Sequence, residues 1–431
     1  MATHRNPVSR RGLLRLGAAG VAAGVGGPLL AGCSRAPAGD SGGDKTFRIY
    51  WNAGHGYKTY EKVIKKFEAD HGITVTWQKY QWEDLRTKLL TDIQAGNPPD
   101  LCEDDGSGWP VNFATTGDAL ALDDFIAKDD GRSGYPHDWQ PSSLRNAIYR
   151  GRHYGVPLHL TCSLLFYNKA MLADAGLRTP PATWDEFLTA ARKLTHGNQY
   201  GVALNSDPGY AGPWFEQNGV RLYDPATKRI LTPRDAAVEA MQFQSDLIYK
   251  HKVGQVPAAS SDYSGPQKLM SARRAAMIIS GPWDIAPIRT DPKFPLGLAL
   301  PLEGEKRATI LAGAGMFIPA KSKHPELAWD LITRFTALET EFAVTKEVGV
   351  TMPRKSWASS SRISGDPLIG TVAESLKYGQ NFAQGLGATG KQNEVSDAYK
   401  SFYQAVILSG REPADELPAF AARAEKILGR S

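Results

Sequence analysis

The chain has 431 residues, with 50 lysines and arginines against 45 aspartates and glutamates, and a formal charge of +5 at pH 7. Residues 1–32 hold four of the arginines and no acidic residue, so the remainder has 46 basic residues against 45 acidic ones and is nearly neutral. A nearly neutral body without a lysine-rich block gives no electrostatic basis for binding nucleic acid. Its length, about 390 residues, exceeds what one hydrophobic core usually organises and predicts two lobes.

An export signal is indicated at the N-terminus. Arg10 and Arg11 precede a weakly apolar stretch at 16–32, an arrangement typical of twin-arginine export. That stretch has 17 residues, six of them glycine, and a membrane-spanning helix needs about 20 predominantly apolar ones. Residues 30–33 (Leu-Ala-Gly-Cys) resemble the lipobox of bacterial lipoproteins, in which the cysteine is acylated. We therefore expect 1–33 to be a signal that ends at a lipidated Cys33, on the outer face of the cytoplasmic membrane.

A flexible tether is predicted at 34–45, which is rich in glycine, serine, alanine and proline. Within it, residues 39–43 match the nucleophile string of chymotrypsin-like proteases. No predicted strand–turn–helix frames Ser41, so we interpret the match as linker composition.

Two further cysteines, Cys102 and Cys162, leave two alternatives open. A disulfide is permitted outside the cytoplasm, and two separately buried thiols are equally compatible with the sequence. His159 and Cys162 lack further partners for a metal site. We expect no metal and no other cofactor.

Four elements alternate at the start of the folded body. They are a strand at 46–51, a helix at 59–71, a strand at 73–77 and a helix at 82–95. The first helix has apolar residues at three- and four-residue spacing and stops at Gly72. Strands that alternate with helices of this length predict a parallel sheet covered on both faces.

The later elements follow the same logic. A stretch rich in strand formers at 154–167 is followed by helices at 184–194, 233–251, 325–342 and 393–408. Thr183 is the expected N-cap of the first of these helices.

Six stretches of the body carry a resemblance to a known family. They are residues 67–75, 95–101, 155–169, 175–187, 276–283 and 328–332. In this order they resemble the extracellular solute-binding proteins of ABC importers, specifically the sugar-binding proteins of the maltodextrin type, over about residues 46–428.

The resemblance implies an α/β, two-lobe periplasmic-binding-protein fold (type II-like) with a hinge of crossing strands. Lobe 1 would comprise 46–157 plus 311–353, and lobe 2 would comprise 158–310 plus 354–431. The implied function is to capture a carbohydrate, specifically an oligosaccharide, and to deliver it to an ABC permease. The resemblance also implies a monomer and a protein that is not an enzyme. A cationic solute, such as an amino sugar or polyamine, and a secreted glycoside-active enzyme remain alternatives.

Sugar sites combine aromatic platforms with polar side chains that bind hydroxyls. Trp283 follows a strand that ends at Gly281-Pro282, and it matches the family's ligand-stacking tryptophan. The other candidates are Asn52, His55 and Tyr57 after the first strand, Asp104, Asp105 and Trp109 in an acidic loop, His159 and Thr161 at the hinge, Tyr210 and Trp214 in an aromatic loop, and Gly313 and Gly315 in the return segment.

Ordinary structural roles stand beside these candidates. The acidic loop can be a solvated surface loop. The two glycines can mark a tight strand entry instead of a close approach to ligand. His55 departs from the charged residues of the maltodextrin proteins, so their hydroxyl contacts are not transferred to it.

Overall fold

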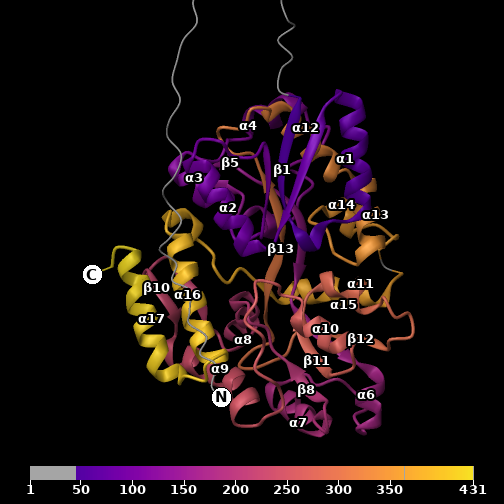
Figure 1. The fold of residues 1–431 in the computed structure, drawn as a ribbon, viewed down its shortest axis with the longest axis vertical. Coiled ribbons are helices and arrows are strands. Elements are labelled where there is room, and N and C mark those ends of the chain that lie inside the picture. Colours follow the sequence, from indigo (N-terminus) through magenta and orange to yellow (C-terminus); the bar gives the residue numbers. More distant parts are fainter. Residues whose placement is uncertain (1–44, 364, 431) are drawn as a thin grey trace, which may run out of the picture. The chain divides into compact units, whose positions relative to one another are not determined.

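The computed structural model describes residues 45–363 and 365–430. The predicted signal with Cys33 and residues 34–44 of the predicted tether, Ser41 among them, lie outside the described residues. The described body is a mixed α/β structure with two main sheets (Figure 1). Among the described residues, no helix is long and apolar enough to cross a membrane.

The first sheet gathers strands from distant parts of the chain. Its strands are β2 (Thr74–Tyr80), β1 (Thr46–Asn52), β3 (Leu101–Asp104), β13 (Thr309–Phe317) and β14 (Gly379–Gln380), with β6 (Val156–Cys162) paired to β13. β1 is parallel to β2 and β3, as predicted. β13 is antiparallel to both β3 and β6, so the predicted parallel sheet is correct for β1, β2 and β3 and wrong for β13. The alternation of strands and helices predicts the relative direction of strands that follow one another in the sequence. β13 begins more than two hundred residues after β3, so this pattern does not predict its direction.

The second sheet has the order β12 (Leu296–Ala299), β7 (Leu164–Asn168), β11 (Ala275–Ser280) and β8 (Tyr200–Ala203). β7 is antiparallel to β11 and β12, while β11 and β8 are parallel. The predicted strand-forming stretch at 154–167 is thus two strands in different sheets, with only Ser163 between β6 and β7. Two short hairpins, β4 (Ile148–Tyr149) with β5 (Arg152–His153) and β9 (Arg221–Asp224) with β10 (Arg229–Thr232), complete the strands described.

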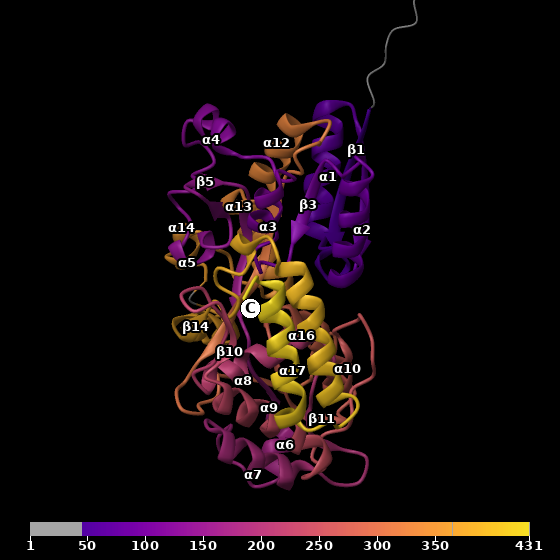
Figure 2. The same cartoon turned by 90° about the vertical axis from the view of Figure 1, so that its left-hand side faces the viewer.

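Helices surround both sheets (Figures 1 and 2). The α-helices are α1 (Lys58–His71), α2 (Trp82–Gln94), α3 (Trp109–Thr116), α4 (Asp123–Asp129), α5 (Pro141–Leu144), α6 (Lys169–Asp174), α7 (Trp184–Leu194), α8 (Gly212–Gln217), α9 (Arg234–Tyr249), α10 (Gly265–Ser271), α11 (Ile285–Ile288), α12 (Pro325–Phe335), α13 (Leu338–Val348), α14 (Lys355–Ala358), α15 (Pro367–Ser375), α16 (Gln392–Ile407) and α17 (Pro413–Ile427). Short 3₁₀ turns are η1 (Ala53–His55), η2 (Pro208–Ala211), η3 (Pro282–Asp284), η4 (Leu376–Tyr378) and η5 (Gly387–Thr389).

Local end signals account for several of these bounds. α1 stops at Gly72, whose φ of +63° is the left-handed conformation that glycine adopts at low cost. α7 begins after Thr183, whose side-chain oxygen accepts a hydrogen bond from the Glu186 amide at 3.2 Å, as predicted. The single helix expected at 325–342 is wrong: α12 ends at Phe335, and the extended backbone of Ala337 (φ −61°, ψ 137°) separates it from α13.

Two large buried clusters hold the body together. One cluster includes Trp51 of β1 in the first sheet and Phe166 of β7 in the second, with Trp139 also among its members, so it joins the two sheets. The other includes Phe187 of α7 and Tyr403 of α16 and lies under the C-terminal helices. α16 and α17 pack side by side against α9, as Figure 2 shows. Burying one such aromatic or aliphatic side chain contributes about 1.5–3 kcal/mol to the free energy of unfolding.

Cys102 in β3 and Cys162 at the end of β6 are free, buried thiols. Of the two alternatives left open by the sequence, the structure therefore has separate thiols. Burial raises the pKa of the Cys162 thiol to about 12 and raises that of Cys102 as well. Both thiols are protonated at neutral pH and inert as nucleophiles.

Candidate functional site

The ends of the first sheet's strands and loops of the second sheet converge on a cavity of about 270 Å³. It is lined by His55, Trp82, Asp105, Gly106, Ser107, Ser163, Asp207, Gly209, Tyr210, Tyr263, Trp283, Ile310, Leu311, Ala312, Gly313, Asn381, Phe382 and Ala383. His55 follows β1 and Asp105 follows β3, so two parallel strands present their carboxyl ends to it. Crevices at such strand ends are the usual ligand sites of open α/β sheets.

Five aromatic side chains line this cavity, and they come from five separate segments. They are Trp82 of α2, Tyr210 of η2, Tyr263 of the loop before α10, Trp283 of η3, and Phe382 after β14. The Trp283 indole Nε1 donates to the Tyr210 hydroxyl at 3.3 Å, and the two rings are nearly perpendicular (88°). The hydrogen bond holds both rings in place, which leaves apolar faces for a ligand with C–H surfaces.

The charged groups on the cavity wall are acidic. Asp105 accepts a hydrogen bond from the Ser107 amide at 2.9 Å, and Asp207 accepts one from the Gly209 amide at 2.8 Å. Burial raises the pKa of both carboxyls above their ordinary value. Among the described residues that line the cavity, none is lysine or arginine. The wall therefore offers acceptors for hydroxyl groups and disfavours an anionic ligand.

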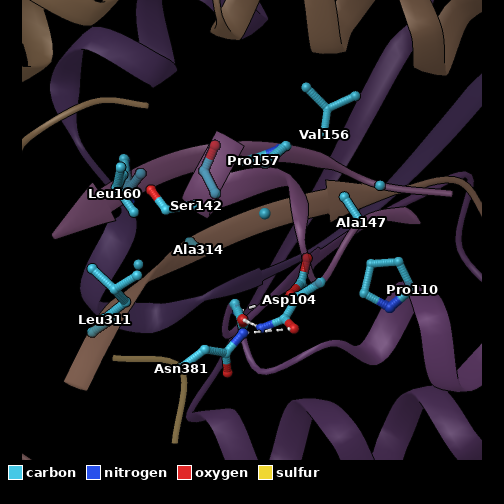
Figure 3. Close-up of a pocket in the computed structure, with 18 residues that line it drawn as sticks. Asp104, Pro110, Ser142, Ala147, Val156, Pro157, Leu160, Leu311, Ala314 and Asn381 are labelled. Atoms are coloured by element: carbon cyan, nitrogen blue, oxygen red, sulfur yellow. Dashed lines mark hydrogen bonds between the residues drawn. The ribbon is translucent and has the colours of Figure 1, made fainter. Parts of the chain in front are cut away.

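A smaller cavity of about 50 Å³ adjoins the first, and the two share lining residues that include Gly106 and Gly313. Asp104 and Asn381 lie together on one side of it, with Pro157 and Leu160 of β6 on the other side of β13 (Figure 3). Gly313 has a φ of +156°, and a Cβ there would lie 2.2 Å from the His159 carbonyl oxygen. At this position the glycine is needed for the close approach of β13 to β6.

The structure brings many of the predicted residues together. His55, Asp105, Tyr210, Trp283 and Gly313 line the larger cavity, while Asp104, His159, Gly313 and Gly315 line the smaller one. Asn52 and Tyr57 are buried beside His55. Thr161 is buried on β6 and lines neither cavity.

Two predicted tryptophans lie elsewhere. Trp214 is 1% exposed and packs against Trp184, Phe187 and Phe243. All six residues of α8 are buried, so this helix turns its tryptophan into the core. Trp109 stacks edge-on against Trp82 and lines a neighbouring hollow of about 150 Å³.

Behind the cavity wall lies a buried polar cluster formed by His55, Glu103 and His159, with exposed fractions of 6%, 0% and 4%. His55 Nδ1 is 2.5 Å from Glu103 Oε1, and the Asn52 amide donates to Glu103 Oε2 at 2.6 Å. The rings of His55 and His159 have centroids 5.1 Å apart, and His159 Nε2 is hydrogen-bonded to the Tyr60 hydroxyl at 2.9 Å.

Burial dominates the protonation of this cluster. It raises the pKa of Glu103, although the hydrogen bonds from His55 and Asn52 oppose the shift. Burial, together with the neighbouring His55, holds the pKa of His159 well below its ordinary value. His159 is therefore a neutral imidazole at pH 7.

Sequence patterns did not point to Trp82, Asp207, Tyr263, Asn381 or Phe382 as wall residues. Trp82 begins an amphipathic helix, which makes it look like core, and Asn381 and Phe382 lie in a loop without periodicity. Their convergence depends on how distant loops meet, which no local pattern encodes.

Comparison with known proteins agrees with this architecture. The family model described as bacterial extracellular solute-binding protein matches residues 52–347. A putative binding protein of Brucella abortus (strain 2308) is 26% identical over 380 residues, covering 86% of this chain and 89% of the relative. The diacetylchitobiose binding protein DasA of Streptomyces coelicolor is 23% identical over 370 residues, which cover 82% of this chain and 82% of the relative.

Solved structures give the same result. A solute-binding protein of an ABC transporter from Thermotoga lettingae, bound with α-D-tagatose, superimposes with a TM-score of 0.80 at 27% identity, over 89% of this chain and 99% of that one. The acarbose-binding receptor GacH of Streptomyces glaucescens has the same fold, with a TM-score of 0.78 at 21% identity over 89% and 98% of the two chains. The fold is thus the two-lobe α/β fold of the maltose-binding-protein-like periplasmic binding proteins, as predicted. The family model matches more than half of this chain, so the chain belongs to the bacterial extracellular solute-binding proteins.

Proposed function

We propose that the protein is the substrate-binding component of an ABC importer and that it holds a carbohydrate in the larger cavity. One observation carries this proposal: five aromatic side chains from separate segments surround a single space whose charged groups are Asp105 and Asp207. Aromatic faces bind the C–H surfaces of sugar rings, and carboxylates accept their hydroxyl protons. Relatives named for arabinooligosaccharide, maltotriose and diacetylchitobiose support a sugar as the ligand class.

The size of the cavity favours a short saccharide. At about 270 Å³ it lies just below the about 300–1,000 Å³ that is usual for small-molecule sites. Trp283 and Tyr210 form one corner of this space, and Asp105 and Asp207 supply acceptors.

We further propose that two lobes close over the ligand, with lobe 1 at 46–157 plus 311–353 and lobe 2 at 158–310 plus 354–431. β6 and β13 of the first sheet would then cross from one lobe to the other. Ion pairs join α2 to α16: Glu83 pairs with Lys400, and Arg86 pairs with Asp397. Contacts of this kind, made between elements of different lobes, stabilise the closed form that a ligand selects.

Retention at the cell surface is a separate part of the proposal. Residues 1–33 would direct export, and lipidation of Cys33 would keep the monomer near its permease. Replacement of Cys33 by alanine is expected to move the protein from the membrane fraction to the medium. Membrane retention of that variant would contradict lipidation.

Calorimetric titration of the full chain tests the ligand class. The panel contains monosaccharides and malto-, cello-, xylo- and chito-oligosaccharides, with polyamines as the cationic alternative that the acidic wall also admits. We expect a sugar with a Kd near micromolar, about −8 kcal/mol. Trp283→Ala should weaken it at least about fivefold, since stacking contacts of this kind contribute about 1 kcal/mol or more.

The matched control is Trp184→Ala, which removes another half-buried tryptophan that lies outside the cavity and bonds to Gln217. Unchanged sugar affinity in Trp283→Ala would contradict the proposed site. Binding of polyamines without binding of sugars would identify a cationic solute. New reducing ends after incubation with the oligosaccharides would indicate an enzyme.

A further inference from the structure

The buried cluster of His55, Glu103 and His159 has the composition of a metal centre. Its three donor atoms lie within 4.8 Å of one another. In the part of the chain that the structure describes, it is the one group of three or more histidine, cysteine, aspartate or glutamate side chains gathered so closely. The members come from η1, β3 and β6: β3 and β6 are strands of the first sheet, and η1 directly follows its strand β1.

The carboxylate of the cluster is held in position. Glu103 Oε2 accepts from the Asn52 amide at 2.6 Å, which leaves Oε1 facing His55 Nδ1 at 2.5 Å. Within the described chain, neither lysine nor arginine forms a hydrogen bond or an ion pair with this carboxylate. An ionised carboxylate that is fully buried needs a compensating positive charge, which a bound metal ion would supply.

Unpartnered polar atoms adjoin the cluster. The Tyr57 hydroxyl and Asn52 Nδ2 are buried without a hydrogen-bond partner, as is the Thr161 hydroxyl. The Tyr57 ring is 7% exposed and lies 5.6 Å from the His55 ring and 6.1 Å from the His159 ring. Thr161 is two residues beyond His159 on β6 and so shares its face of the strand. Buried polar atoms nearly always have partners, so their gathering here indicates that a polar guest belongs beside them.

The donor set selects the kind of guest. Two imidazoles and one carboxylate suit zinc and the neighbouring divalent transition metals, whereas magnesium and calcium prefer oxygen ligands alone. A histidine that binds metal usually hydrogen-bonds through its other ring nitrogen, and the Tyr60 hydroxyl gives His159 such a partner.

We propose that His55, Glu103 and His159 bind a divalent transition metal of the zinc class, with one coordination position left for water or a ligand hydroxyl. In the metal-bound form, the ion takes the place of the direct hydrogen bond between His55 and Glu103. His55 also lines the larger cavity, and His159 lines the smaller one. The metal therefore lies next to the cavity wall, and bound metal and bound solute would change each other's affinity by the same factor.

The test uses the metal alone, so it is independent of the proposed sugar. ZnCl₂ is titrated by calorimetry into the chelator-treated full chain at pH 7.5, with MgCl₂ as the comparison ion. We expect one zinc per chain with a Kd at or below about micromolar and no magnesium binding. His159→Gln and Glu103→Gln should each weaken zinc binding about 100-fold or more. The exposed His137, outside the cluster, supplies the matched control His137→Gln, which should bind as the unaltered protein does.

Failure would be equally clear. Absence of zinc binding overturns the proposal. Equal zinc affinities of the unaltered protein and the three variants also overturn it, because they would indicate an adventitious ion only. Circular dichroism and thermal unfolding verify that the variants fold. If a variant does not fold, the cobalt-loaded unaltered protein decides: visible d–d bands of tetrahedral Co²⁺ that zinc abolishes support the site, and their absence rejects it.

Discussion

The Tyr263 hydroxyl donates a hydrogen bond to Asn52 Oδ1 over 3.3 Å, and thereby joins the loop before α10 to the carboxyl end of β1. The same Asn52 oxygen accepts from the Gly54 amide at 2.8 Å, and the Asn52 amide donates to Glu103. One asparagine thus connects the cavity wall, the turn that carries His55 and the buried cluster.

Removal of this contact should weaken solute binding. Tyr263→Phe deletes one hydrogen bond between elements of the two proposed lobes, and such a bond contributes about 1 kcal/mol. We expect the Kd for the sugar to rise about fivefold in calorimetry. Tyr249→Phe is the control, because the Tyr249 hydroxyl bonds to the Ile407 carbonyl at 2.9 Å outside the cavity. Equal affinities of the two variants would show that the Tyr263 contact does not stabilise the bound form.

Reversal of the charge at Lys400 should weaken the proposed closure of the two lobes. Lys400→Glu places a carboxylate next to Glu83 of α2, where the native pair attracts. Exposed pairs contribute about 1 kcal/mol or less, so we expect the sugar affinity to fall a few-fold and the fall to shrink in high salt. The double variant Glu83→Lys/Lys400→Glu should restore the affinity. Lys391→Glu disturbs only a pair with Glu394 at the start of α16 and should leave affinity unchanged.

The stability of the fold should depend on Glu341. Neither carboxyl oxygen of this buried side chain has a hydrogen-bond partner, and burial raises its pKa from 4.5 to about 9. At neutral pH the carboxyl is protonated in the folded protein and ionised in the unfolded chain. Its contribution to stability is therefore fully present below pH 4.5 and is lost as the pH rises towards 9.

Glu341→Gln removes that titration and keeps the size of the side chain. The variant should exceed the unaltered protein in free energy of unfolding by about 3 kcal/mol at pH 7, with the difference vanishing near pH 4. Urea unfolding at both pH values measures it. Glu339→Gln, on the exposed side of α13, should show no such pH-dependent gain. A gain that persists at pH 4 would disprove the titration of Glu341.

The passage of β13 beside β6 depends on Gly313. Gly313→Ala would bring a Cβ to 2.2 Å from the His159 carbonyl oxygen at a φ of +156°. We expect a loss of about 2 kcal/mol or more in free energy of unfolding, since backbone must shift. Gly370→Ala, in the middle of α15 with no atom within 4 Å of the new Cβ, should instead gain about 0.5–1 kcal/mol. Equal stabilities of the two variants would contradict the pairing of β13 with β6.

Local features were predictable from the sequence because local chemistry decides them. Gly72 ends α1 and Thr183 caps α7 through contacts within a few residues. The direction of β13 and the inward turn of Trp214 depend on segments far away in the chain, so periodicity could not give them. The sequence predicts His55 as a candidate ligand-binding residue in a loop, whereas Glu103 is part of a run of acidic residues that is typical of a solvated loop. Only the pairing of β1 with β3 puts these two side chains together.

The single residue between β6 and β7, Ser163, couples the two sheets mechanically. Ser163 leads directly from one sheet into the other, its carbonyl accepts a hydrogen bond from the Thr309 hydroxyl at 2.6 Å, and the residue lines the larger cavity. A change in the angle between the sheets would therefore act directly on this joint, because no slack chain separates β6 from β7 there. Under the proposed function, a solute in the cavity would touch this joint directly, and its presence would act on the angle between the two sheets without a relay through the surrounding helices.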